Sequence, residues 1–290
     1  MKISNITLDF ELLERQEYRE ITMIPIKTGY SNLDLLTLKK GFELGLVEVS
    51  ECEESTVNEI MISNKSTTPL VLINDEEIVG AKQNRIVNVS MLVPQKTTMK
   101  IPVSCVEQGR WNFKENFKQS EYMANSSTRR KKARHNFRDA NLQSEVWQSV
   151  DTLDERLCVE SPTRAMHESY EHERKRSEDY LKHFHIEGKQ TGAIILINDN
   201  IVGMELFHNH KLYSEYHEKI LKSYIIDTNQ KQEAIVELDD FIDALTRSKY
   251  TDNNVEGMGK NFRFTNEYGN GSLLSYENNL IHMSYLKKII

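Results

Sequence analysis

The sequence is short of the residues that mark secreted and membrane proteins. It holds three cysteines, Cys52, Cys105 and Cys158, which lie far apart and show no paired spacing. An odd number of scattered cysteines argues against a disulfide framework and a four-cysteine zinc site. The longest apolar runs, such as residues 193–197, are far too short to cross a bilayer as a helix. The first residues alternate and then turn acidic, unlike a secretory signal. We therefore expect a cytoplasmic protein with no membrane partner.

Positive charge is also in deficit. Lys and Arg number 37 against 44 Asp and Glu, which gives a net charge of -7. Binding to a nucleic-acid backbone needs clustered Lys and Arg, so nucleic acid is not an expected partner. A small anion can still bind at a local basic site. Hydrophobic residues make up 38% of the chain, which is enough for a core and argues against disorder.

One stretch departs from this acidic balance. Residues 128–135 read TRRKKARH. Such a run either binds a nucleotide or RNA, or forms a solvated helix face that nearby acidic residues offset. No aromatic side chains are interleaved with it, as they are in proteins that bind single-stranded nucleic acid. We therefore favour the solvated helix face.

The first of three segments, residues 1–111, has the pattern of mixed strands with one short helix. Asn32 is a typical N-cap residue, and apolar residues at helical spacing follow it between 35 and 42. Apolar and polar side chains alternate along residues 86–93 and again along residues 99–105. This alternation predicts two strands, each with one apolar face.

The second segment, residues 112–190, is polar, highly charged and poor in glycine. Apolar residues between 142 and 157 recur at spacings of three and four, which predicts an amphipathic helix. Ser161 and Pro162 match the start of the next helix. We expect this segment to be a charged helical insertion.

The third segment, residues 191–290, returns to mixed structure. Its expected elements are strands at 193–197 and 201–202, helices at 212–225 and 232–245, and a closing hairpin over 271–285. Together the segments predict an α+β fold in one compact domain. Its mixed sheets would be built from two related β units with the charged helical insertion between them.

The two β units are suggested by an internal echo. Residues 70–80 read LVLINDEEIVG and residues 194–203 read IILINDNIVG. The echo indicates either a duplicated β unit, with a binding site at the junction, or two ordinary hairpins with the same turn chemistry. The shared string is longer than turn chemistry requires, which favours duplication.

Polar side chains are densest between two apolar strands of the first segment. After an acidic pair and a Gly-Ala hinge come four polar residues with long side chains; the set is Glu76, Glu77, Lys82, Gln83, Asn84 and Arg85. Lys and Arg in such a connection suit phosphate, while Gln and Asn suit ribose hydroxyls or base edges. The alternative is a solvated loop with ordinary surface ion pairs.

A second polar cluster follows the strand at 99–105. Glu107 lies at the strand end, and Arg110 and Trp111 come just after a glycine. Arg pairs with anions through its planar fork, and Trp offers a flat face to a nucleobase. The alternative is that Trp111 anchors the core and Glu107 pairs with Arg110.

Nucleophiles and metal ligands are harder to find. Cys105 shares the apolar face of its strand, where a cysteine is usually buried and inert. The histidines include the close pairs 183/185 and 208/210, but none follows a recognised ligand spacing. We expect no metal and no cofactor.

Several strings resemble the ARPP family, the ARG-and-Rhodanese-Phosphatase-superfamily-associated proteins. The most specific are GAKQNR at 80–85 and IPVSCVEQGRW at 101–111, and weaker ones extend the resemblance over nearly the whole chain. The family's name records gene neighbours that include ADP-ribosylglycohydrolases and phosphatase-like proteins. The resemblance therefore implies chemistry of NAD-derived or ADP-ribose-type nucleotides. Our predicted ligand-binding residues are its matching positions, Glu76, Glu77, Lys82, Gln83, Asn84, Arg85, Asn88, Glu107, Arg110 and Trp111.

Three functions stay open on these residues. The first is a protein that binds or sequesters an ADP-ribose-type nucleotide, cyclic ADP-ribose-like signals included. The second is an enzyme that hydrolyses or transfers such a nucleotide, with Glu107 or Glu77 as general acid or base. The third is a protein-interaction module that uses residues 112–190 and takes no small ligand. Binding is favoured over turnover, because the residues offer donors but no recognisable nucleophile, metal cage or acid–base pair. Homo-oligomer formation stays open.

Overall fold

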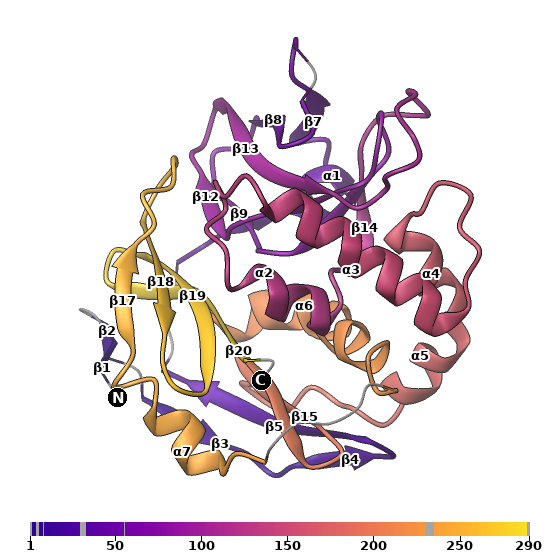
Figure 1. Ribbon diagram of the computed structural model, residues 1–290. Coiled ribbons are helices and arrows are strands. Elements are labelled where there is room, and N and C mark those ends of the chain that lie inside the picture. Colours follow the sequence, from indigo (N-terminus) through magenta and orange to yellow (C-terminus); the bar gives the residue numbers. More distant parts are fainter. Residues whose placement is uncertain are drawn as a thin grey trace. The chain divides into compact units, whose positions relative to one another are not determined.

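The computed structural model describes residues 2–3, 6–7, 9–29, 33–54, 56–229 and 235–288. They belong to two compact units. Unit 1 combines residues 1–33, 175–255 and 259–290, and unit 2 combines residues 34–174 and 256–258. The chain therefore begins in unit 1, builds unit 2 and returns to unit 1, as the colours of Figure 1 allow the eye to follow.

The larger sheet of unit 2 has six antiparallel strands in the order β14-β10-β11-β13-β8-β7. In chain order they are β7 (Val47–Glu51), β8 (Glu59–Asn64), β10 (Glu76–Val79), β11 (Arg85–Val87), β13 (Thr97–Cys105) and β14 (Lys118–Met123). The strand predicted along 99–105 is confirmed in β13. Its last residue, Cys105, pairs with Arg85 at the start of β11. This register brings the chain after β13 next to the loop between β10 and β11.

A three-stranded sheet completes the β structure of unit 2. Its strands are β6 (Leu36–Thr37), β9 (Leu70–Leu72) and β12 (Met91–Val93), in the order β12-β9-β6. The single strand predicted over 86–93 is therefore wrong, because these residues form β11 in one sheet and β12 in the other. The switch occurs near Ser90, whose hydroxyl accepts the N–H of Asn74. The alternation of side chains survives a change of sheet, so the pattern did not reveal it.

Four helices belong to unit 2: α1 (Leu38–Glu43), α2 (Ser126–Lys132), α3 (Leu142–Leu157) and α4 (Met166–His172). The amphipathic helix predicted over 142–157 is confirmed as α3. The helix start predicted at Ser161 is wrong, since α4 begins at Met166. The Ser161 hydroxyl instead accepts the N–H of Ala165. The expected cap at Asn32 lies outside the described residues, and Thr37 caps α1. The predicted helical segment also contains a strand, β14.

The basic run lies on and just after α2, and two of its cations are buried. Arg129 Nε is 3.4 Å from Asp75 Oδ2, and Lys132 Nζ is 2.6 Å from Asp75 Oδ1. The prediction of a solvated helix face is therefore wrong for these two residues, while Arg134 is exposed. Their partner precedes the run by more than fifty residues, so local charge balance did not identify it. Burial lowers the pKa of Lys132, against the attraction of Asp75.

Unit 1 is built on a nine-stranded antiparallel sheet in the order β17-β18-β19-β20-β16-β15-β5-β3, with β4 also paired to β5. Its strands are β3 (Phe10–Leu12), β4 (Gln16–Tyr18), β5 (Ile21–Thr28), β15 (Gly192–Ile197), β16 (Asn200–Phe207), β17 (Lys249–Asp252), β18 (Lys260–Thr265), β19 (Gly269–Tyr276) and β20 (Asn279–Lys287). A separate pair is formed by β1 (Lys2–Ile3) and β2 (Ile6–Thr7). The closing hairpin predicted over 271–285 is confirmed in β19 and β20.

The helices of unit 1 are α5 (Arg174–Leu181), α6 (His210–Ile225) and α7 (Leu238–Asp243). The helix predicted over 212–225 is confirmed as α6. The one predicted over 232–245 is shorter, and residues 232–234 lie outside the description. Within the described residues, no helix combines the length and the apolar character that a membrane crossing requires.

The repeated strings at 70–80 and 194–203 form two different connections between strands. In unit 1, β15 and β16 pair directly through a turn in which Asn198 and Asp199 both have positive φ. In unit 2, β9 and β10 belong to different sheets, joined by a turn with Asp75 at φ 72°. The chain thus has both helices and mixed sheets, as an α+β fold requires, but only the later copy of the echo is a hairpin.

Candidate functional site

The loop at residues 80–84 leaves β10 through a constrained backbone. Gly80 has φ +119° and Ala81 has φ 42°. A Cβ at residue 80 would lie 2.6 Å from the carbonyl oxygen of Asn116, closer than real Cβ atoms approach. The N–H of Gly80 donates to Asn84 Oδ1 (3.0 Å), which closes the loop. The Gly-Ala hinge noted in the sequence therefore directs the polar residues that follow it.

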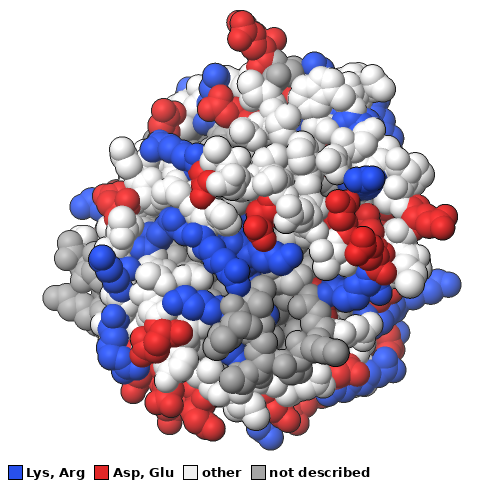
Figure 2. Space-filling view, viewed as in Figure 1, with Lys and Arg blue, Asp and Glu red and all other residues white. Residues whose placement is uncertain are grey.

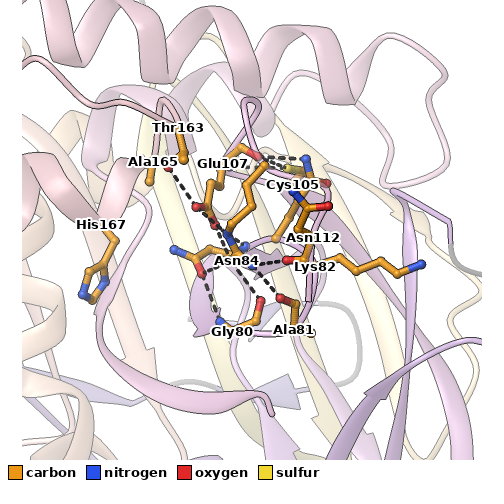
Figure 3. A network of polar contacts seen from close by, with 12 residues as sticks. Gly80, Ala81, Lys82, Asn84, Cys105, Glu107, Asn112, Thr163, Ala165 and His167 are labelled. Atoms are coloured by element: carbon orange, nitrogen blue, oxygen red, sulfur yellow. Dashed lines mark hydrogen bonds and ion pairs between the residues drawn. The ribbon is translucent and has the colours of Figure 1, made fainter. Parts of the chain in front are cut away.

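Glu107 lies just after β13 and holds this loop. Its Oε1 accepts from Arg110 Nε (2.8 Å) and Thr163 Oγ1 (2.9 Å). Its Oε2 accepts from Arg110 Nη2 (2.6 Å) and the N–H of Asn84 (3.0 Å), and Figure 3 shows how these groups converge. We call Glu107, Arg110, Asn84 and Thr163 the Glu107 cluster. Burial pushes the pKa of Glu107 up, but these donors outweigh it and the pKa is lowered. A carboxylate with four donors stays ionised at neutral pH and keeps no acceptor site for a substrate.

Arg110 is committed to the same cluster. Besides its paired bonds to Glu107, its guanidinium donates to the carbonyl oxygens of Gly80 (3.2 Å), Ala81 (2.5 Å) and Asn112 (3.0 Å). These bonds make Arg110 a clamp that fixes the loop. The expected alternative, in which Glu107 pairs with Arg110, is confirmed for these two residues.

Arg85 differs from Arg110 in having open donors. Its side chain is 0% exposed, and its Nη1 donates to Gln83 Oε1 (2.8 Å). Gln83 in turn donates to the carbonyl oxygen of Glu107 (2.8 Å). Within the described residues, Arg85 Nε and Nη2 have no hydrogen-bond partner. In Arg110 the corresponding two atoms, Nε and Nη2, donate hydrogen bonds to Glu107. Burial lowers the pKa of Arg85, against the nearby Cys105 and Glu51.

Glu51, at the end of β7, is a site residue that sequence reasoning missed. Its Oε2 forms an ion pair with Arg85 Nη2 at 3.9 Å, beyond hydrogen-bond distance, and has no hydrogen-bond partner in the described part of the chain. Its Oε1 accepts the N–H of Lys82 (3.1 Å). Glu51 precedes Arg85 by more than thirty residues, and no local pattern in the sequence marks it. The sheet order brings the two strands onto one surface.

Trp111 lies beside this pair and is 44% exposed, so it is not the core anchor considered as an alternative. Its ring centroid is 5.3 Å from Lys82 Nζ and 5.7 Å from Arg85 Cζ, both within the range of a cation–π contact. In Figure 3 the side chain of Lys82 extends away from the Glu107 cluster. An aromatic face flanked by two cations is suited to a ligand that joins a flat ring to an anion.

Glu77 lies on the opposite face of the sheet. Ile78 pairs with Arg85 and Glu77 with Ile86, so Glu77 and Arg85 point to different faces. Glu77 is fully buried, and its Oε2 accepts from Ser120 Oγ (2.6 Å) and contacts His167 Nδ1 (2.9 Å). His167 lies ninety residues further along the chain and was not a predicted site residue. Only the fold brings it to Glu77.

Two other predicted residues lie away from Trp111. Glu76 begins β10 and is buried. Asn88 follows the far end of β11, where its Oδ1 accepts from Ser104 Oγ (2.9 Å). The structure therefore brings together seven of the predicted positions: Lys82, Gln83, Asn84, Arg85, Glu107, Arg110 and Trp111.

The wider surroundings bear on charge and on nucleophiles. Lys and Arg gather in distinct groups on the face seen in Figure 2, so the net negative charge is not spread evenly. Cys105 is buried, as predicted, and burial raises the pKa of its thiol, which makes it a poor nucleophile. Among the described residues, no three His, Cys, Asp or Glu side chains are grouped as a metal would require.

Comparison with known protein families gives a match over nearly the whole chain. The sequence pattern of the ARG and Rhodanese-Phosphatase-superfamily-associated Protein domain, ARPP-1, matches residues 9–286. Comparison with curated proteins and with solved structures gave no match. The matched range includes both β10–β11 and the residues after β13, so it covers the whole site described above.

Proposed function

The chain belongs to the ARPP-1 family, and we propose that it binds an ADP-ribose-type nucleotide on the sheet face that carries Arg85 and Glu51, next to Trp111. The proposal rests on two nitrogen atoms of the Arg85 guanidinium. Its Nε and Nη2 are buried without a hydrogen-bond partner among the described residues. Leaving a buried donor unsatisfied costs about 1–3 kcal/mol, and more for a charged group. A phosphate offers two oxygens at the spacing of these two nitrogens.

Glu51 requires that the ligand also carry a hydrogen-bond donor. Its Oε2 is an acceptor without a hydrogen-bond partner in the described residues, and its negative charge would repel a bare phosphate. A ligand that places a hydroxyl beside its phosphate satisfies both groups. Ribose supplies such hydroxyls, and carboxylates bind them in many dinucleotide sites. This pairing of acceptor and donor favours a sugar nucleotide over inorganic phosphate or pyrophosphate.

Trp111 supplies the remaining element of the proposal. Its half-exposed ring can stack on adenine, which contributes about 1–3 kcal/mol per base. Arg85 is covered, so binding requires a local movement. Trp111 lies near Arg85 and is partly free in solvent, which makes it the side chain best placed to turn aside.

Capture without turnover fits this face better than catalysis. Glu107, the acid or base considered from the sequence, has all its acceptor sites filled and a lowered pKa. It is therefore a poor proton donor and a poor base at neutral pH. We extend the proposal to a nucleotide held in the cytoplasm, where the three free cysteines would stay reduced.

The test is a thermal-shift screen with NAD, ADP-ribose, cyclic ADP-ribose, AMP and pyrophosphate, followed by chromatography of each mixture. At about a hundred times its dissociation constant, a ligand stabilises the protein by about 2.7 kcal/mol. We expect the largest shift with ADP-ribose or a cyclic form, a small shift with pyrophosphate, and ligand recovered intact. A new product would replace capture by turnover. No shift with any nucleotide would leave the protein-interaction module as the better account.

Two variants locate the site. Trp111→Ala should weaken ADP-ribose binding about tenfold or more, given the strength of base stacking. Phe113→Ala is the matched control, since Phe113 is an exposed aromatic residue two positions further along the chain. Equal losses in the two variants would place the nucleotide elsewhere.

A further inference from the structure

A second group of polar side chains lies on the other face of the six-stranded sheet. It joins Glu77 of β10, Ser120 and Tyr122 of β14, and His167 and Glu171 of α4, which we call the His167 cluster. The Glu77 carboxylate is fully buried and is held by Ser120 Oγ at 2.6 Å. Its other oxygen, Oε1, is buried without a hydrogen-bond partner in the described residues. A buried carboxylate fixed in this way is a rigid support for the imidazole next to it.

The contact with Glu77 orients the His167 ring. Nδ1 is 2.9 Å from Glu77 Oε2, so Nδ1 carries the proton that the carboxylate accepts. Nε2 is then the nitrogen that can take up or release a proton. It lies 3.8 Å from Glu171 Oε1, too far for a direct hydrogen bond, and the side chain is 31% exposed. A water molecule about 2.8 Å from each atom would bridge them.

The Glu171 carboxylate is held in place as well. Its Oε1 accepts from the Tyr122 hydroxyl (2.7 Å), and its Oε2 lies 3.4 Å from Arg174 Nη1. The Tyr122 ring packs edge-on to His167 with centroids 5.2 Å apart and stacks on Tyr170 at 4.6 Å. Both groups that would hold the water are therefore positioned by neighbours.

We propose that the His167 cluster is a hydrolytic site, in which His167 Nε2 activates a water molecule held against Glu171 for attack on a neutral carboxylic ester. The water oxygen bonds to the ester carbonyl carbon while its proton passes to Nε2. The bond from that carbon to the alcohol oxygen then breaks, and the proton returns from Nε2 to the departing alcohol. The products are one carboxylic acid and one alcohol, and the histidine is restored. The groups that carry out this step lie on the opposite face of the sheet from Arg85 and Glu51, and none of them belongs to the proposed nucleotide site.

The charges around His167 select the substrate class. Three carboxylates act on its charge: Glu77 from β10, Glu171 from its own helix, and Glu107 from the chain after β13. Arg174 Nη1 lies 3.4 Å from the outer oxygen of Glu171, and Tyr122 of β14 is neutral, because burial and Glu171 raise the pKa of its hydroxyl. A phosphate ester would be repelled by this set, whereas an uncharged ester would not.

The same charges predict how the rate depends on pH. Burial of His167 disfavours its charged form, but the hydrogen bond and the charge of Glu77 outweigh this and raise its pKa above 6.5. Only the neutral imidazole can accept the proton of water. The rate should therefore rise with pH through the raised pKa of His167 and then level off.

The experiment follows hydrolysis of p-nitrophenyl acetate by the full-length protein between pH 5.5 and 9. His167→Gln should lower the protein-dependent rate about tenfold or more, as expected for loss of a general base. His172→Gln is the matched control, because His172 is an exposed histidine on the same helix, and its rate should stay within twofold of wild type. p-Nitrophenyl phosphate should not be hydrolysed.

A second variant separates catalysis from folding. Glu77→Gln removes the charge that raises the pKa of His167, so the rising limb of the pH profile should move to lower pH while the histidine remains. A merely structural Glu77 would lower the rate at every pH without moving the limb. Equal rates in His167→Gln and His172→Gln, or a limb that does not move in Glu77→Gln, would overturn the proposal.

Discussion

Replacing Glu107 with glutamine should destabilise unit 2 rather than remove a proton donor. The substitution keeps the shape of the side chain but removes the charge that Arg110 binds with Nε and Nη2. It also places an amide N–H₂ among donors, since Thr163 and the N–H of Asn84 point at the same group. The loop at 80–84 would lose the acceptor that fixes it to the end of β13.

The magnitude follows from the burial and the remaining bonds. Breaking a buried ion pair by removing one partner costs about 3–5 kcal/mol. Arg110 would still donate to the carbonyl oxygens of Gly80, Ala81 and Asn112, which reduces the loss. We therefore expect the low end of that range, about 3 kcal/mol, at neutral pH.

Denaturant unfolding followed by tryptophan fluorescence measures this directly, because both tryptophans, Trp111 and Trp147, lie in unit 2. The folded pKa of Glu107 is lowered, so its stabilisation is present above the unfolded pKa and is lost as pH falls through the folded pKa. The gap between wild type and variant should therefore shrink in acid. Glu48→Gln, at an exposed ion pair, is the control and should change stability by less than about 1 kcal/mol. A gap below that value at pH 7, or one that does not change with pH, would refute the clamp.

Three further perturbations test other parts of the structure. Gly80→Ala should lower the free energy of unfolding by about 1–3 kcal/mol, because Gly80 has a positive φ and lies close to the Asn116 carbonyl. Gly188→Ala, in open space, is the control and should be nearly neutral. Similar effects in both variants would contradict the loop geometry. Asp75→Asn should destabilise unit 2 by about 3 kcal/mol, since it leaves two buried cations without their carboxylate, and denaturant unfolding with less than 1 kcal/mol of change would argue against the burial of Lys132. Wild type should be more stable than His167→Gln, and this difference should be greatest below the unfolded pKa of the histidine and fade as pH rises through its raised folded pKa. NMR titration of the His167 ring measures the folded pKa. A folded pKa at or below 6.5 would contradict the contact with Glu77.

Elements set by local spacing could be predicted from the sequence. The apolar spacing of residues 142–157 gave α3, and the alternation of residues 99–105 gave most of β13. The break between β11 and β12 could not be predicted, because side chains alternate in the same way whether a strand stays in one sheet or passes to another. The buried cations of α2 were missed for a related reason, since Asp75 comes from a distant turn.

For the candidate site, the positions of the polar residues in the sequence could be predicted, but their contacts could not. Two polar strings were predicted to contain the ligand-binding residues, and the register of Arg85 with Cys105 brings them together. The individual roles of the two arginines were not predictable, because the residue type is the same. Only the folded structure shows that Arg110 binds Glu107 and that Arg85 keeps two nitrogens without a hydrogen-bond partner in the described residues. Glu51 and His167 reach the two faces from distant segments and carry no motif of their own.

The most direct test of nucleotide binding observes Arg85 itself. Arginine Nε–Hε resonances of ¹⁵N-labelled protein can be followed by NMR during titration with ADP-ribose, with Arg85→Lys used to assign the signal. We expect the Arg85 signal to move saturably to a 1:1 complex, while the signal of Arg110, already bound to Glu107, moves little. If ADP-ribose binds and the Arg85 signal stays in place, the nucleotide occupies another site and Arg85 does not bind it.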